Sequence, residues 1–221
     1  MCRFLLVKSR TSISPKQFLI SFSQMARNSR SYDGDWQGDG WGISWLQNNL
    51  WQTQKFLSPV WEDSWVFANF PPTTLFSVHA RSASFPSHKG NIEYNQPFID
   101  KSYSFVFNGL LKGVSLSSDL PGDIGAQKIW FLLKKLLRRL PPDQALEKIK
   151  QIILKNSHQI QALNIGLSDQ ENIYALNFYS SHLGYYQLYC LKQNDIQIIC
   201  SEKLTGEYKF KKITPNSVIK L

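Results

Sequence analysis

The chain has 221 residues, of which 43% are hydrophobic and 14% aromatic, enough for the core of one large domain or two small ones. This composition excludes an intrinsically disordered protein. The three cysteines, an odd and sparse count, argue against a disulfide framework and fit a reducing cytoplasm. The formal net charge of +9 raises the question of a polyanion partner, which the distribution of the charges helps to decide.

The first half of the chain predicts one helix among several strands. Short apolar runs, punctuated by glycine, predict strands at residues 3–7, 38–46, 75–80 and 104–107. The helix is predicted to begin near Ser14, because Ser14, Pro15 and Gln17 match an N-cap, a first-turn proline and a capping-box glutamine.

The second half predicts a helical pair followed by strands. Apolar residues recur at helical spacing over residues 127–140 and 142–156. Further strands are predicted at residues 162–168, 173–179, 185–192 and 196–200. The basic residues of KKLLRRL at 134–140 fall opposite the apolar positions, which favours a solvated helix face and leaves polyanion binding as a minor alternative. Strands grouped on both sides of a helical pair indicate an α+β fold, with antiparallel sheets covered by helices.

The sequence carries none of the common metal or nucleotide motifs. None of the four histidines has a second ligand three or four residues away, and there is no CxxC pair. The G-x-S-x-G motif is missing, and the glycines at 38–42 lack the spacing of a phosphate-binding loop. No apolar stretch matches a signal peptide or a membrane span. We therefore expect a cytoplasmic protein without a metal or cofactor.

Cys2 directly follows Met1 and admits two interpretations. It can start a buried strand as a small hydrophobic residue, since free cysteine is among the most buried residue types. Alternatively, removal of Met1 leaves a thiol nucleophile and a free α-amine base on the same N-terminal residue. Position alone favours the first interpretation.

Three other stretches combine polar residues with apolar surroundings. Arg81 ends an apolar strand, where its guanidinium either binds a carboxylate bidentately or forms an ordinary salt bridge. Asn108 and Gly109 lie between hydrophobic runs, which is typical of a type I′ hairpin turn; in the functional interpretation their amide and N–H form an oxyanion hole. The glycines in GDGWG at 38–42 are interpreted as a tight turn into a strand.

Short motifs occur in a distinctive order, namely MCR at 1–3, DGWG at 39–42, HARSAS at 79–84, NQPF at 95–98, NG at 108–109 and SEKL at 201–204. In this order they resemble the class II glutamine amidotransferases of the N-terminal-nucleophile hydrolase superfamily. The similarity is greatest to the stand-alone branch that includes γ-glutamyl amidohydrolases of thiol metabolism. The family usually has threonine where this chain has Ser84, and histidine where it has Gln96 and Phe107. The resemblance covers essentially the whole chain.

The resemblance implies a single domain over residues 1–221, folded as a four-layer αββα sandwich. It implies that Cys2, exposed by removal of Met1, attacks a γ-glutamyl amide and forms a thioester that water hydrolyses. It assigns Asn108 and Gly109 to the oxyanion hole, and Arg81 to the α-carboxylate of a small-molecule γ-glutamyl substrate. No segment is left for an acceptor domain, so hydrolysis is favoured over transfer unless a partner subunit collects the ammonia.

One position departs from the family pattern. The family aspartate that holds the substrate α-ammonium aligns with Gly125, and Asp123 is the candidate replacement. Two alternatives therefore stay open, namely an inactive relative that binds a glutamyl-like ligand or a partner protein, and a basic binding module. A membrane partner is not expected, and nucleic acid is disfavoured.

Overall fold

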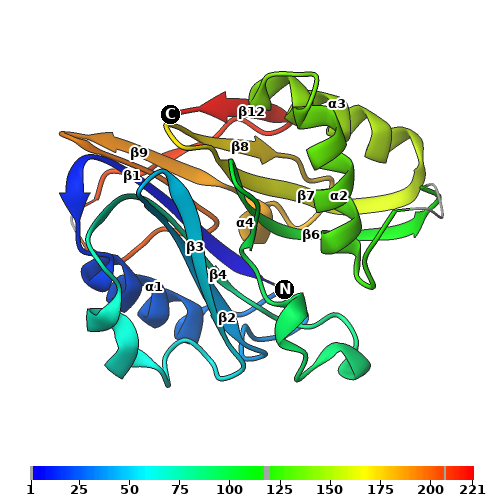
Figure 1. Cartoon of the computed structure of the whole chain (residues 1–221). Helices are drawn as coiled ribbons and strands as arrows, with labels where there is room; N and C mark the ends of the chain where they lie inside the picture. The colour runs from blue at the N-terminus through cyan, green and yellow to red at the C-terminus, as the bar shows by residue number, and fades with distance from the viewer. Residues whose placement is uncertain (1, 117–119, 207) are drawn as a thin grey trace.

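Two antiparallel β-sheets, packed face to face, form the centre of the computed structural model, which describes residues 2–116, 120–206 and 208–221 (Figure 1). Among these residues, the larger sheet has seven strands in the order β11-β9-β10-β1-β4-β2-β3. They are β1 (Arg3–Ile13), β2 (Trp41–Gln47), β3 (Leu50–Phe56), β4 (Thr73–Ala80), β9 (Tyr189–Gln193), β10 (Ile196–Cys200) and β11 (Lys211–Lys212). The smaller sheet, in the order β12-β8-β7-β6-β5, contains β5 (Phe98–Ile99), β6 (Ser104–Val114), β7 (Ser157–Ser168), β8 (Ile173–Asn177) and β12 (Ser217–Lys220). The predicted antiparallel sheets are confirmed.

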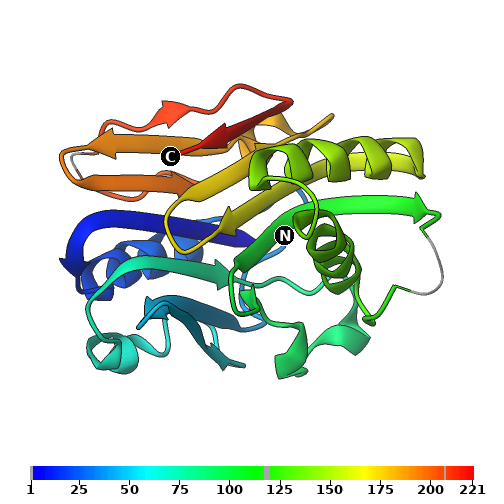
Figure 2. The ribbon, with the colours of Figure 1, turned by 45° about the horizontal axis from the view of Figure 1, so that its top comes forward.

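Helices cover the two outer faces of this pair of sheets (Figures 1 and 2). Helix α1 (Lys16–Asn28) packs against the larger sheet. Helices α2 (Gly125–Leu137) and α3 (Pro142–Lys155) pack against the smaller sheet and against each other. The layers follow the order helix, sheet, sheet, helices, so the αββα sandwich is confirmed. The shorter helices are α4 (Leu183–Tyr186) and the 3₁₀ helices η1 (Ser64–Asn69), η2 (Pro86–His88) and η3 (Ile92–Tyr94).

Alternating side chains along β1 explain why this strand lies between two apolar layers. Leu5 and Val7 pack into the cluster that contains α1, whereas Phe4 and Leu6 face the smaller sheet. Val106 of β6 belongs to the same cluster as Phe4 and Leu6. Since successive side chains of a strand point to opposite faces, the even-numbered residues at the start of β1 point between the sheets.

Helix α2 presents apolar residues inward and basic residues outward. Ile129 and Leu133 are buried, whereas Lys135, Arg138 and Arg139, at the end of the helix and just beyond it, are exposed. This arrangement agrees with the interpretation of KKLLRRL as a solvated face. No helix within the described part of the chain has the length and apolar character needed to cross a membrane.

Asn108 and Gly109 lie in the middle of β6, so the predicted hairpin turn is wrong. They pair with Asn164 and Leu163 of β7 in an antiparallel ladder whose register shifts only farther along, between Leu110 and Leu111. A Cβ atom on Gly109 would lie 2.2 Å from the carbonyl oxygen of Ala162. The glycine is therefore required by the close approach of the neighbouring strand and not by a turn.

Two other local predictions need correction. The segment at 185–192 was predicted as a strand throughout, but its first two tyrosines belong to α4 and the strand begins at Tyr189. The residue that caps α1 is Pro15, without a side-chain cap, while the Ser14 hydroxyl accepts a 3.4 Å hydrogen bond from the Lys16 N–H. The predicted Ser14–Gln17 capping box is therefore absent from this part of the structure.

Candidate functional site

A cavity of about 650 Å³ lies where the start of β1, the η2–η3 segment, β6 and the start of α2 meet. In Figures 1 and 2, the N-terminal end of the chain lies next to β6 and α2. The candidate site residues Cys2, Arg81 and Gly109 line this cavity, as does Gly125. The fold thus gathers residues that are far apart along the chain.

The ladder between β1 and β4 positions Cys2. Arg3 pairs with Ala80, so the residue before Arg3 lies beside the residues that follow Ala80. The Cys2 thiol is half-buried, and it donates a 3.7 Å hydrogen bond to the carbonyl oxygen of Ser82. The Ser82 hydroxyl in turn donates to the carboxylate of Asp35, which fixes this turn of the chain.

Arg81 is buried beside Cys2 and is fixed by neutral groups. Its guanidinium donates to Asn95 Oδ1 at 3.2 Å and to the carbonyl oxygen of His88 at 2.7 Å, and it lies 5.6 Å from the ring centre of Tyr94. Burial lowers the pKa of Arg81, while negative charge on Cys2 and Asp39 opposes that shift. Because Arg81 forms no ion pair with a described residue, its charge is available to an anionic ligand.

The glycines of the DGWG motif allow the segment that holds Arg81 to approach β2. Gly40 has φ +108°, and a Cβ atom there would lie 2.2 Å from Asn95 Nδ2. A Cβ atom on Gly42 would lie 2.5 Å from the carbonyl oxygen of Gln96. The side chain of Asn95 donates to the carbonyl oxygen of Phe56 at 2.7 Å and accepts from Arg81. Asn95 is thus a positioning residue that the sequence marked only as part of NQPF.

Two buried side chains fix β6 just before Asn108. Gln96 Oε1 accepts a hydrogen bond from the Phe107 N–H at 2.6 Å, and His79 Nε2 lies 3.2 Å from the Phe107 carbonyl oxygen. Burial lowers the pKa of His79 to about 3, so its ring is neutral at pH 7. Because a carbonyl oxygen only accepts, Nε2 carries the proton and donates it to Phe107. His79 therefore joins β4, the strand that precedes Arg81, to β6, the strand that carries Asn108.

Asn108 is only 1% exposed, and neither Nδ2 nor Oδ1 has a hydrogen-bond partner among the described residues. Its side chain shares a strand face with Val106 and thus points between the sheets. Phe107 and Gly109, on either side of it, line the cavity, whereas Asn108 itself is not a lining residue. A buried amide without a partner costs about 1–3 kcal/mol, so a group in this state calls for an explanation.

The backbone N–H of Gly109 points toward the open edge of β6. In a strand, the N–H groups of residues two apart point to the same side. The Phe107 N–H points away from β7, since it donates to Gln96, and the Gly109 N–H follows the same direction. Strand β5 pairs only with Ser104 and Phe105, so it ends before Gly109. An amide side chain and a backbone N–H, neither with a strand or side-chain partner in the described part of the chain, are thus adjacent in sequence beside the cavity.

Gly125 and Asp123 differ in their position relative to the cavity. Gly125 is the first residue of α2 and lines the cavity, and a Cβ atom there would meet nothing within 4 Å. Asp123 is exposed and is not a lining residue; its carboxylate accepts a 3.2 Å hydrogen bond from the hydroxyl of Tyr94. The Asp123 backbone N–H donates to Gln127 Oε1 at 2.9 Å. No carboxylate therefore belongs to the described cavity wall.

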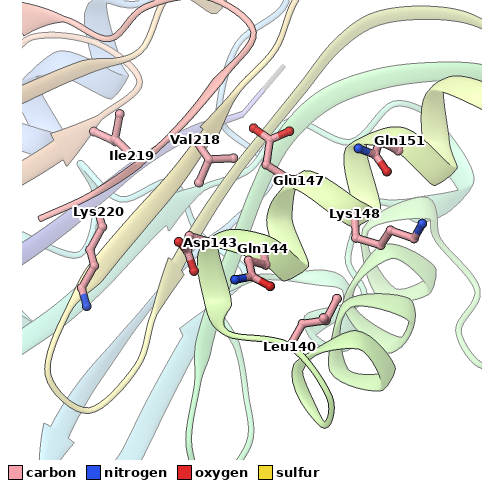
Figure 3. A pocket seen from close by; sticks show the side chains of 9 residues that line it. All are labelled: Leu140, Asp143, Gln144, Glu147, Lys148, Gln151, Val218, Ile219 and Lys220. Carbon is pink, nitrogen blue, oxygen red and sulfur yellow. The ribbon is translucent and has the colours of Figure 1, made fainter.

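A second hollow of about 580 Å³ lies between the start of α3 and β12, and it offers no comparable chemistry (Figure 3). Its lining residues are Leu140, Asp143, Gln144, Glu147, Lys148, Gln151, Val218, Ile219 and Lys220. Figure 3 shows polar side chains spread along α3, without a cysteine or serine among them, and Glu147 forms an ion pair with Lys150 at 2.6 Å. Among the described residues, no group of three or more His, Cys, Asp or Glu side chains could hold a metal ion.

No protein-family model and no curated protein matches the chain. Solved structures do match it over 99% of its length. A glutamine aminotransferase class-II domain protein from Silicibacter pomeroyi has a TM-score of 0.66 at 15% identity, and 94% of that chain is covered. A predicted glutamine amidotransferase from Pseudomonas aeruginosa has a TM-score of 0.57 at 14% identity, with 96% of that chain covered.

The glutamine phosphoribosylpyrophosphate amidotransferase from B. subtilis has a TM-score of 0.69 at 12% identity. The match covers 99% of the present chain and 47% of that longer one. The resemblance to class II glutamine amidotransferases is thus confirmed at the level of the fold.

Proposed function

We propose that this protein hydrolyses the γ-amide of glutamine or of a γ-glutamyl compound, with Cys2 as an N-terminal nucleophile after Met1 is removed. The observation that carries the proposal is the buried amide of Asn108, which has no hydrogen-bond partner among the described residues and is adjacent to the Gly109 N–H on the edge of the cavity that Cys2 lines. Such a pair of donors suits an oxyanion that forms only when a carbonyl is attacked.

The proposed reaction proceeds through a thioester. The Cys2 sulfur attacks the γ-carbonyl carbon while the Cys2 α-amine, whose reference pKa is about 8, takes the thiol proton. Asn108 Nδ2 and the Gly109 N–H donate to the oxyanion of the tetrahedral intermediate. Collapse breaks the C–N bond, and the leaving amine takes the proton from the α-ammonium. Water then attacks the thioester, gives a proton to the α-amine and releases glutamate and the free thiol.

Arg81 is proposed to bind the α-carboxylate of the glutamyl group. The support is its position beside Cys2, its burial and its lack of an ion-pair partner among the described residues. A guanidinium fixed by Asn95 and His88 is already oriented, so little rotamer freedom is lost when a carboxylate binds. Hydrolysis is the proposed outcome in the cytosol, and an ammonia-accepting partner subunit would convert it to transfer.

The decisive experiment compares Cys2→Ala with Cys190→Ala. We expect wild-type protein to release glutamate from glutamine or from a γ-glutamyl anilide, and Cys2→Ala to abolish this release. Cys190 is a matched control because it is also half-buried, but it lies on β9 and burial raises its pKa. Cys190→Ala should therefore keep the wild-type rate, as should Cys200→Ala.

A measurement of the intact mass of the protein tests whether Met1 has been removed. The active preparation should lack Met1, since a blocked α-amine cannot act as the base. A homogeneous protein that retains Met1 and still turns over substrate contradicts the mechanism. A processed protein that binds a γ-glutamyl ligand without hydrolysing it supports the alternative of an inactive, ligand-binding relative.

A further inference from the structure

Beyond Gly109, the wall of the cavity changes from polar to apolar. The half-buried or buried residues of this part come from β6, the segment after it, and the start of α2. They are Leu110, Leu111, Val114, Leu116, Ile124 and Ile129. Apolar side chains that remain accessible inside a cavity gain free energy when an apolar ligand covers them.

The cavity is larger than a glutamyl group requires. Its volume of about 650 Å³ falls in the range of sites that enclose drug-sized ligands, roughly 300–1,000 Å³. A glutamyl group held between Arg81 and Cys2 would occupy only the polar end. In that arrangement the carbonyl that Cys2 attacks would lie next to Gly109, and the group attached to it would extend along β6 toward the apolar end.

The charged groups of the cavity are all cationic. Besides Arg81, the wall contains Lys112 on β6 and Lys128 on α2, and it contains no aspartate or glutamate among the described residues. Both lysines are exposed, and neither forms an ion pair with a described residue. A ligand with an apolar body and a second negative charge, remote from Arg81, would match this distribution.

We propose that the leaving group is an apolar α-amino acid, so that the preferred substrates are γ-glutamyl dipeptides such as γ-glutamyl-leucine and γ-glutamyl-phenylalanine. This inference rests on the proposed hydrolysis. The apolar side chain packs against Leu110, Leu111 and Ile124, and the C-terminal carboxylate lies near Lys112 or Lys128. Free glutamine fills neither of these positions, and a plain apolar amine leaves the lysines without a partner.

Steady-state kinetics test both parts of the inference. The value of kcat/KM for γ-glutamyl-leucine should exceed that for γ-glutamyl-glycine by roughly 10–100-fold, from burial of the additional side chain. It should exceed that for γ-glutamyl-leucinamide, which lacks the carboxylate, by about fivefold. The ratio of kcat/KM for γ-glutamyl-leucine to that for γ-glutamyl-leucinamide should fall toward one in the double variant Lys112→Gln, Lys128→Gln. Lys135→Gln is the matched control, because Lys135 is exposed on α2 but does not line the cavity.

A binding measurement separates this inference from the proposed reaction. Calorimetry on the Cys2→Ala protein should show tighter binding of γ-glutamyl-leucine than of γ-glutamyl-glycine. Equal affinities and equal kcat/KM values overturn the inference and leave hydrolysis by Cys2 intact. Preferential binding without hydrolysis by the wild-type protein overturns the proposed reaction and supports the apolar site.

Discussion

Arg81 and Asn108 are both buried polar side chains at one cavity, but their hydrogen bonding is opposite. The Arg81 guanidinium is held by Asn95 and by the carbonyl of His88, whereas neither amide atom of Asn108 has a partner among the described residues. A satisfied buried group stabilises the fold, while an unsatisfied one costs about 1–3 kcal/mol. The hydrogen bonds of Arg81, in the carboxylate-binding half of the proposed site, therefore stabilise the fold. The unsatisfied amide of Asn108, in the oxyanion half, lowers the stability of the fold.

Arg81→Ala should have the largest effect of the substitutions that test this comparison. We expect kcat/KM to fall by an amount that corresponds to a loss of transition-state stabilisation on the order of 2–5 kcal/mol, because an oriented charge opposite the substrate carboxylate is removed. The melting temperature should also fall, since Asn95 loses its donor. Steady-state kinetics and calorimetry measure the two effects. Arg81→Lys keeps the charge without the fork of donors, and it should recover only part of kcat/KM. An unchanged kcat/KM in Arg81→Ala would exclude Arg81 from substrate binding.

Asn108→Ala should separate activity from stability. The expected fall in kcat is about 10²–10³-fold, the usual loss for one oxyanion donor. The melting temperature should stay the same or rise, because the variant removes a buried amide that no described residue hydrogen-bonds. Retained activity together with a clearly lower melting temperature would show that Asn108 has a structural role instead.

His79 connects the two halves, and its titration predicts how stability depends on pH. Burial lowers the pKa of His79 in the folded protein from 6.5 to about 3, so between these values only the unfolded chain takes up the proton. The free energy of unfolding should therefore fall as pH drops through this window, by roughly 1.4 kcal/mol per pH unit from this group. Urea unfolding at several pH values measures the slope.

His79→Gln is the matched variant for this measurement, because its amide can still donate to the Phe107 carbonyl but does not titrate in this range. The slope below pH 6.5 should be smaller in this variant than in the wild type. Equal slopes would mean that other groups account for the loss of stability in acid.

Gly125→Asp should have the smallest effect and should improve activity. The cavity wall contains no described carboxylate, and the space around Gly125 can accept a side chain. We expect kcat/KM for glutamine to rise about fivefold, from one partly exposed contact to the substrate α-ammonium. A different outcome would contradict this expectation, namely efficient use of glutamine by the wild-type protein that Asp123→Ala abolishes. Asp123 would then bind the substrate α-ammonium, although it is not a lining residue of the cavity.

Most of the strands could be predicted because their apolar residues are contiguous or alternate along the chain. The edge strand β3 could not, since its sequence LWQTQKF buries only Trp51 fully and carries several exposed polar residues. The turn predicted at Asn108 and Gly109 failed for a related reason. The local preference of Asn-Gly is for a turn, but Gly109 is required by the carbonyl of Ala162, a contact that local sequence does not reveal.

The residues proposed for the site were found through short motifs, but their supporting contacts were not. The motifs marked Cys2, Arg81 and Gly109, and the structure places all three in one cavity. The contacts of Asn95 with Arg81 and of Gln96 with Phe107 join segments that lie 14 and 11 residues apart, across different strands and loops. Only the folded chain shows them, because no periodicity or spacing connects such residues.

Strand β6 has one further property that follows from its short neighbour. Because β5 pairs only with Ser104 and Phe105, the far side of residues 106–114 has no strand beside it in the described structure. An edge of this kind can add a strand from a second molecule and begin aggregation. The Gln96 side chain occupies the Phe107 N–H, and the exposed Lys112 places a charge farther along the same edge. A side-chain cap on one N–H and a charge farther along are two features that disfavour strand addition, and here they stand on the edge that carries the proposed oxyanion donor Gly109.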